Sequence, residues 1–98
     1  MSARLAGKVA LVTGASRGLG RAIAELLAGE GCAIAAIDLK PQWAKATADA
    51  ITASGGKAIG IGADVSHRQA VNDAIDATAS ALGRLDVLVN NAMWNRYD

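Results

Sequence analysis

Short apolar runs alternate with longer amphipathic stretches along the whole chain, and this alternation limits the folds that are open to it. Four runs have the length of strands: 8–13, 33–38, 57–63 and 86–90. Three intervening stretches are expected to be helices: 18–29, 41–54 and 66–82. The first run is apolar on both faces, which is typical of a parallel sheet covered on both sides. The order therefore predicts an α/β protein with right-handed crossovers.

Local end signals support the helices. Pro41 stands where the second helix would begin, and the Gly pair 55–56 would close it. Ser66 and Gln69 have the spacing of a capping box, and Gly83 would end the helix behind them. We therefore expect the third helix to begin with a capped first turn.

Composition excludes several classes of protein. Hydrophobic residues make up 52% of the chain and charged residues 19%, which excludes disorder. A net charge of +1 gives no basic surface for nucleic acid. The single Cys32 forms no internal disulfide, and no apolar run is long enough for a membrane span or a signal peptide. We expect a cytoplasmic protein with neither nucleic acid nor membrane as a partner.

Residues 13–20, TGASRGLG, follow the first predicted strand in the pattern T-G-x-x-x-G-x-G. Gly14 would turn the chain out of the strand, Gly18 would let the backbone approach a pyrophosphate, and Gly20 would let helix and strand pack closely. The helix start would offer N–H groups to phosphates, and Ser16 and Arg17 could add a hydroxyl and a charge. An ordinary glycine-rich turn is the alternative, but the position after the first strand favours a nucleotide site.

Two carboxylates end later strands. Asp38 lies eighteen residues after Gly20 and could accept both hydroxyls of an adenosine ribose. Asp64 could accept from an adenine amino group, with Val65 flanking the base. A solvated charge is the alternative for Asp38, and a helix-start residue is the alternative for Asp64.

Three other residues invite functional readings that we do not favour. His67 has no Cys or second His nearby, so we expect an exposed first-turn residue and no metal site. Cys32 is expected to be a small buried hydrophobe and not a nucleophile. For Trp43, packing is favoured over stacking on adenine.

The glycine motif, Asp64-Val65 and the Asn90-Asn91-Ala92 segment together resemble the short-chain dehydrogenase/reductase family. All 98 residues align with the first part of that family's domain, which makes residues 1–98 the N-terminal portion of an NAD(P)-binding Rossmann domain. The implied fold is a partial doubly wound sheet of four parallel strands in the order 3-2-1-4 with three helices. Right-handed crossovers place the first two helices on one face and the third on the other. The fourth strand is then an open edge.

The resemblance also implies roles for individual residues. The glycine loop would line the pyrophosphate and the nicotinamide ribose through Gly14, Ser16, Arg17, Gly18, Leu19 and Gly20. Asp38 would hold the adenosine ribose, and Asp64 and Val65 would bracket the adenine. Because Asp38 only accepts hydrogen bonds when ionised and would repel a 2′-phosphate, NAD is favoured over NADP, although Arg17 acts in the opposite direction.

Asn91 and Ala92 would contact the cofactor ribose, while Asn90 would help to fix the central strands. A plain turn is the alternative reading of the Asn pair. The family pattern continues with glycine, but Met93 stands there, and Met does not adopt a positive φ cheaply. The loop is therefore expected to bend differently or to crowd the nicotinamide side.

The implied function is hydride transfer between a nicotinamide cofactor and an alcohol or carbonyl substrate, in a protein that forms a homo-oligomer at full length. The family's catalytic Ser and its Tyr-x-x-x-Lys have no counterpart here, since Tyr97 is followed only by Asp98. This chain would therefore supply cofactor binding only. The alternatives are a nucleotide-binding module without catalysis and an interaction protein derived from such an enzyme.

We expect the 98-residue polypeptide alone to be inactive, because no placed side chain can donate a proton to the developing alkoxide. Such a donor typically contributes about 10²–10⁴-fold to the rate. The check is nicotinamide absorbance with a panel of alcohols and ketones, run on the short and the full-length proteins. Steady turnover by the short chain would show that the catalytic group lies among these residues.

Overall fold

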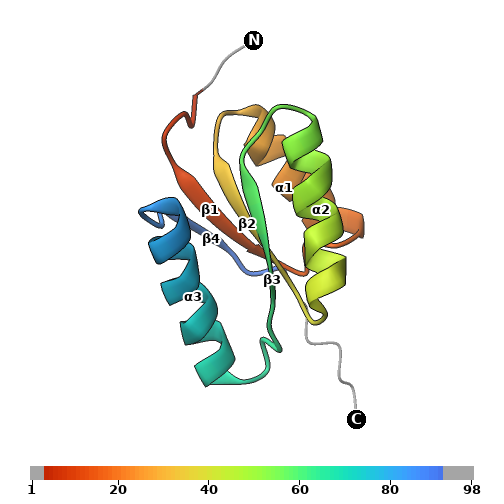
Figure 1. Cartoon of the computed structure of the whole chain (residues 1–98), viewed down its shortest axis with the longest axis vertical. Coiled ribbons are helices and arrows are strands. Elements are labelled where there is room, and N and C mark those ends of the chain that lie inside the picture. Colours follow the sequence, from red (N-terminus) through yellow and green to blue (C-terminus); the bar gives the residue numbers. More distant parts are fainter. Residues whose placement is uncertain (1–3, 92–98) are drawn as a thin grey trace.

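The computed structural model describes residues 4–91, in which four strands alternate with three helices. In chain order the elements are β1 (Val9–Thr13), α1 (Gly18–Gly29), β2 (Ala33–Asp38), α2 (Pro41–Ala53), β3 (Ala58–Gly62), α3 (Arg68–Leu82) and β4 (Val87–Val89). The strands form one parallel sheet in the order β3-β2-β1-β4 (Figure 1). Both the strand order and the α/β class predicted from the sequence are confirmed.

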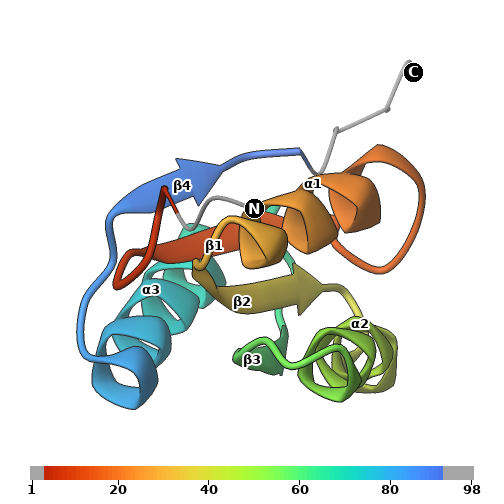
Figure 2. The same ribbon diagram turned by 90° about the horizontal axis from the view of Figure 1, so that it is seen from above.

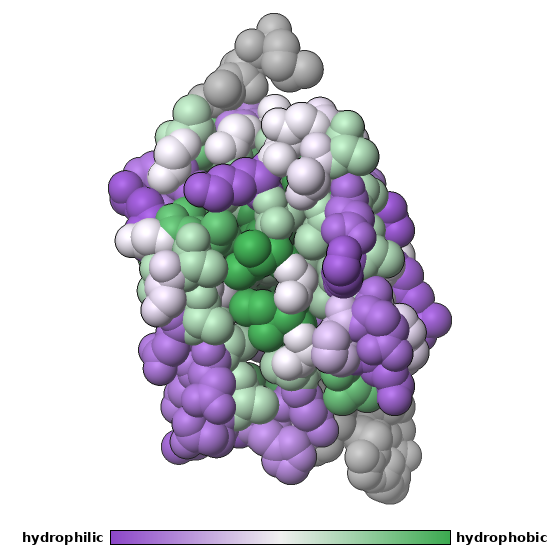
Figure 3. All heavy atoms as spheres, in the orientation of Figure 1, coloured by the Kyte–Doolittle hydropathy of each residue, from purple (hydrophilic) through white to green (hydrophobic). Residues whose placement is uncertain are grey.

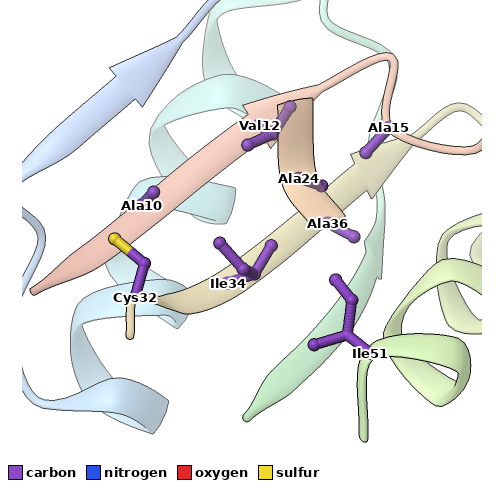
Figure 4. Packing of buried hydrophobic residues seen from close by; sticks show 8 residues of the cluster. All are labelled: Ala10, Val12, Ala15, Ala24, Cys32, Ile34, Ala36 and Ile51. Carbon is purple, nitrogen blue, oxygen red and sulfur yellow. The ribbon is translucent and has the colours of Figure 1, made fainter. Parts of the chain in front are cut away.

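The helices lie on two faces of the sheet because the side chains of β1 and β2 alternate between two hydrophobic clusters. The first cluster joins Ala24 of α1 and Ile51 of α2 to Ala10, Val12, Ile34 and Ala36 (Figure 4). In the second, Ala74 of α3 meets Leu11, Ala35 and Ile37. The view from above shows α1 and α2 on one side of the strands and α3 on the other (Figure 2). The predicted division of the helices is confirmed.

β3 and β4 are the edge strands of the sheet that residues 4–91 form. Half-buried Ile59 and Ile61 of β3 pack toward the α3 cluster. In Figure 3 a hydrophobic strip lies over the middle of the molecule, between the hydrophilic surfaces of α3 and α2. On β4, Leu88 is paired in register with buried Leu11, yet it is 55% exposed. Within residues 4–91, α3 therefore covers its side of the sheet incompletely and leaves the part over β4 exposed.

The sequence misplaced several element ends and the start of α3. The first, third and fourth strands are each one or more residues shorter than predicted. The capping box was wrong, because α3 begins at Arg68 with His67 as its N-cap. Ser66 donates its hydroxyl to Asp64 Oδ1 at 2.6 Å, and Gln69 donates to Asp73 at 2.8 Å. In a capping box the Ser oxygen accepts a backbone N–H of the first helical turn, but here the short bond to the charged carboxylate two residues upstream orients the Ser66 hydroxyl toward its own turn.

Asp86 joins the beginnings of β1 and β4. Its Oδ2 accepts the Val9 N–H at 2.9 Å, and its own N–H donates to the Val9 carbonyl at 2.9 Å. Arg84 donates to the same carboxylate through both Nε and Nη2, at 2.8 and 2.7 Å. The Arg84 guanidinium, followed by the Val9 N–H, lowers the pKa of Asp86 below its ordinary value.

This lowered pKa predicts a pH dependence of stability. A carboxyl whose pKa is lower in the folded state stabilises the fold above its unfolded pKa, which is about 3.9 for Asp. The contribution disappears as the pH falls through the lower, folded value. In the intact protein, Asp86→Asn should lower the free energy of unfolding at pH 7, and its difference from wild type should shrink as the pH falls below about 4. Urea titrations at pH 7 and pH 3 measure both effects.

Asp49→Asn is the matched control, because within residues 4–91 the Asp49 side chain forms an exposed pair with Lys45 and no other ion pair. Exposed pairs of this kind contribute little to stability. A loss for Asp86→Asn that equals the loss for Asp49→Asn, or one that does not depend on pH, would contradict the prediction.

Candidate functional site

The carboxyl ends of the four parallel strands meet at one edge of the sheet, and every sequence-predicted site residue among 4–91 lies on a segment that begins there. The glycine loop follows β1, Asp38 ends β2, Asp64 follows β3 and Asn91 follows β4. The Ala63 N–H donates to the Asp38 carbonyl at 2.8 Å, which continues the β2–β3 pairing past the end of β3.

Two glycines give the loop its course. Gly14 and Gly18 have φ angles of +62° and +60°, a region that L side chains rarely adopt. Between them, Ala15 is fully buried in the cluster under α1 and α2, where Figure 4 shows its methyl group. The Ala15 N–H donates to the carbonyl of Ile37 at 3.1 Å. The loop is therefore anchored in the core at its second residue and turns outward at Gly18.

The N-terminus of α1 is open at Gly18. A Cβ built on Gly18 would meet no atom of residues 4–91 within 4 Å. Arg17 is the N-cap of α1, and its side chain makes no capping hydrogen bond. The first N–H groups of a helix have no intrahelical acceptor, so this end offers donors and a partial positive charge to an anion. Both features fit a dinucleotide pyrophosphate, because phosphate oxygens would approach the backbone where a side chain would otherwise stand.

Gly20 has the opposite surroundings. A Cβ at Gly20 would collide with the Gly14 carbonyl oxygen and would crowd the Asn91 amide. No side chain can be placed there without displacing the loop from β4. The third glycine of the motif therefore lets α1 pack closely against the strand ends.

The carboxylate of Asp38 faces the loop. Its Oδ2 accepts the backbone N–H of Ser16 at 3.0 Å, and its Oδ1 accepts the N–H of Leu39 at 2.8 Å. These two bonds fix the plane of the carboxylate at the end of β2. Each oxygen retains a lone pair with which it can accept a hydroxyl.

Asp64 is engaged in its own turn. Its Oδ1 accepts both the hydroxyl and the N–H of Ser66, and its Oδ2 lies 3.4 Å from Nε2 of His67. The Ser66 bonds, with a smaller contribution from His67, lower the pKa of Asp64. The neighbouring Val65 packs against the cluster under α3. Asp64 thus holds the turn that precedes α3, and it is not the helix-start residue of the alternative reading, because α3 begins at Arg68 with His67 as its N-cap.

The two asparagines connect β4 to β1. The Thr13 hydroxyl lies 3.2 Å from Asn90 Oδ1, and Nδ2 of Asn91 donates to the Gly14 carbonyl at 3.4 Å. These contacts hold the start of the glycine loop beside the end of β4. Ala92 and Met93, for which the sequence predicted a cofactor contact and an altered bend, lie outside the described residues.

Trp43 is not a packing residue, and that prediction was wrong. Its side chain is exposed and lines an open hollow of about 340 Å³ together with Ser16, Arg17, Gln42 and Ala46. The buried stripe of α2 has the spacing Ala44, Thr47, Ala48 and Ile51, from which position 43 is displaced. That stripe was visible in the sequence and would have placed Trp43 off the buried face of α2.

Thr47 is the residue that sequence reasoning missed. It is fully buried in α2, and its hydroxyl donates to the carbonyl of Ala15 at 2.9 Å. Thr47 and Ala15 are 32 positions apart, and no motif links them. Only a buried polar residue within an otherwise apolar helical stripe could have indicated that a partner was needed.

The remaining candidates, Cys32 and His67, lie in surroundings that match the expectations from the sequence. Cys32 is buried, and that burial, with a smaller contribution from the Asp86 carboxylate, raises the pKa of its thiol, which is the environment of an unreactive hydrophobe. His67 is exposed and has Asp64 as its acidic neighbour. Within residues 4–91, no three His, Cys, Asp or Glu side chains are placed to hold a metal ion. No helix in this part of the chain has both the length and the apolar character needed to cross a bilayer.

Known proteins resemble the chain over nearly its whole length. Residues 8–97 match the family model for short chain dehydrogenase. The chain is 51% identical over 88 residues to the short-chain reductase protein NovJ of Streptomyces niveus, which covers 90% of this chain and 34% of NovJ. It is 47% identical over 89 residues to D-threitol dehydrogenase of Mycolicibacterium smegmatis, which covers 91% of this chain and 34% of that enzyme.

A solved structure supports the same relationship. The crystal structure of hydroxysteroid dehydrogenase from Escherichia coli superimposes with a TM-score of 0.89 at 36% identity, over 94% of this chain and 39% of that one. The chain spans about a third of the length of the curated relatives described above. The family match, the relatives and the shared strand order agree, and the chain belongs to the short-chain dehydrogenase family.

Proposed function

We propose that this chain belongs to an NAD(P)-dependent oxidoreductase and that residues 1–98 supply its N-terminal, cofactor-binding portion. The observation that carries the proposal is the open backbone of Gly18 at the start of α1, with the Asp38 carboxylate at the end of the adjacent strand. The bound nicotinamide would supply the hydride acceptor or donor. Relatives named D-threitol dehydrogenase and L-2,3-butanediol dehydrogenase support an alcohol or carbonyl as the other reactant.

The proposed site extends along the carboxyl edge of the sheet. The N–H groups at the start of α1 bind the pyrophosphate, and the whole glycine loop takes part through Gly14, Ser16, Arg17, Gly18, Leu19 and Gly20. Asp38 accepts the adenosine ribose hydroxyls with the lone pairs that Ser16 and Leu39 leave open. Asp64 and Val65 would bracket the adenine, and Asn91 and Ala92 would contact the second ribose.

NAD is the proposed cofactor because Asp38 would stand beside the 2′ position. An ionised carboxylate accepts a 2′-hydroxyl, whereas a 2′-phosphate would bring two negative groups together. Arg17 lies on the same loop and would partly offset that repulsion. We further propose a cytoplasmic homo-oligomer, as the family membership suggests, whose proton donor to the substrate is not among the site residues named above.

The first test uses two glycines with the same backbone requirement. Gly18 and Gly83 both have positive φ, and a Cβ on either would meet nothing within 4 Å in residues 4–91. Alanine should therefore strain both positions similarly, but only Gly18→Ala would place a methyl group where the pyrophosphate is proposed to lie. In the full-length protein we expect Gly18→Ala to weaken NADH binding by about tenfold or more, which corresponds to about 1.4 kcal/mol. Gly83→Ala should bind NADH as wild type does.

The measurement is a fluorescence titration with NADH, with thermal unfolding of both variants as a check on folding. Equal binding by Gly18→Ala and Gly83→Ala would remove the proposed phosphate site from the start of α1.

The second test concerns the choice between NAD and NADP. Asp38→Ser removes the negative charge and replaces the carboxylate by a shorter hydroxyl group. Asp38→Asn also removes the charge but keeps an oxygen that can accept the Ser16 N–H. If charge repulsion sets the preference, both variants should shift the ratio of NAD to NADP affinity toward NADP, by about tenfold or more. Equilibrium binding of both dinucleotides to the full-length protein measures the ratio. A preference for NADP in wild type that Asp38→Ser leaves unchanged would contradict the proposal.

A further inference from the structure

The peptide group between Ala15 and Ser16 is held at both of its polar ends by side chains from elsewhere in the chain. Its carbonyl oxygen accepts the Thr47 hydroxyl at 2.9 Å, and its N–H donates to Asp38 Oδ2 at 3.0 Å. A peptide group is planar, so its carbonyl and N–H turn together. Thr47 in α2 and Asp38 at the end of β2 therefore fix the orientation of the same rigid unit.

This peptide connects the part of the loop that the core holds to the start of α1. The methyl group and the N–H of Ala15 are already fixed by the core and by the Ile37 carbonyl. Beyond Ser16 the chain reaches Arg17, the N-cap of α1, and then Gly18. A rotation of the Ala15–Ser16 peptide would therefore displace the start of α1. It would also break the hydrogen bond between the Ser16 N–H and the Asp38 carboxylate.

Thr47 is suited to prevent that rotation. Its side chain is fully buried, so water does not compete with it for the carbonyl. Buried polar groups in proteins almost always have a hydrogen-bond partner. Without the Thr47 hydroxyl, the Ala15 carbonyl would lose its partner, and turning toward solvent would lower the free-energy cost of leaving it unbonded. The result would be a glycine loop and a ribose-binding carboxylate that are no longer set relative to each other.

We propose that Thr47 is a positioning residue for the dinucleotide: its hydroxyl fixes the Ala15–Ser16 peptide and thereby aligns the glycine loop with Asp38. Thr47 itself touches neither the cofactor nor the substrate in this arrangement. The inference rests on the proposed function, since it assigns Thr47 to the same cofactor site.

The chain offers a matched control for removal of this hydroxyl. Thr78 is also fully buried, but its hydroxyl donates at 2.7 Å to Ala74 within its own helix, α3, on the opposite face of the sheet. Thr47→Val and Thr78→Val each replace a buried hydroxyl by a methyl group and keep the branched shape. Thr47→Ser keeps the hydroxyl and loses only the methyl group. The three variants separate the hydrogen bond from buried volume.

The experiment measures NADH dissociation constants of the full-length variants by fluorescence titration and the exchange rate of the Ser16 amide hydrogen without cofactor. Thr47→Val should weaken NADH binding about tenfold and speed exchange at Ser16. In turnover, KM for the dinucleotide should rise with little change in kcat. Thr78→Val should match wild type in all of these, and Thr47→Ser should lie close to wild type.

Equal NADH binding by Thr47→Val and Thr78→Val, or a Thr47→Ser variant as impaired as Thr47→Val, would overturn the positioning role. If Thr47→Val does not fold, the pair Thr47→Ala and Thr78→Ala makes the same comparison without placing a methyl group against the carbonyl. A wild-type protein that binds neither NADH nor NADPH would overturn the proposed function, whereas the Ser16 exchange rates would still report whether Thr47 holds the loop.

Discussion

The pairing of β1 with both β2 and β4 is the interaction on which the rest of the structure depends. Because all three strands run in parallel, their carboxyl ends meet at one edge, and the segments after them share a small region of space. β1 is buried along its whole length, with successive side chains entering opposite clusters. A central strand covered on both faces fixes the position of the loop that leaves it, and this is the loop with the three motif glycines.

The glycine loop combines a fixed half with an open half. From Thr13 to Ser16 it is held by the core, by β2, by Asn90 and Asn91, and by Thr47 of α2. From Arg17 to Leu19 the loop is exposed at a helix start, and a Cβ on Gly18 would meet open space. A site for a charged ligand benefits from this division, because donors that are already oriented need not be ordered when the ligand binds. The uncharged Thr47 hydroxyl contributes to that order without approaching the ligand.

Two of the corrected predictions have a common cause. For the capping box and for Trp43, a local pattern was interpreted without the neighbour that decided its outcome. Ser66 has the right spacing from Gln69, but the carboxylate of Asp64 takes its hydroxyl. Trp43 is large and apolar, yet α2 turns its small residues toward the sheet and leaves position 43 beside Ser16 and Arg17. In both cases competing contacts outweighed the intrinsic preference of the residue.

The sequence by itself determined the α/β class, because the period and length of its apolar runs follow from local chemistry. The strand order was implied by the resemblance to the family, and the right-handedness of crossovers then gave the division of the helices. The sequence also located the glycines whose backbone conformations few other residues adopt, and it put Asp38 at a strand end. Only the tertiary structure decided that the Asp38 carboxylate binds the Ser16 N–H and that Thr47 reaches Ala15. Those contacts join residues 22 and 32 positions apart, and a direction of side-chain approach across such a distance is set by packing and not by any local pattern.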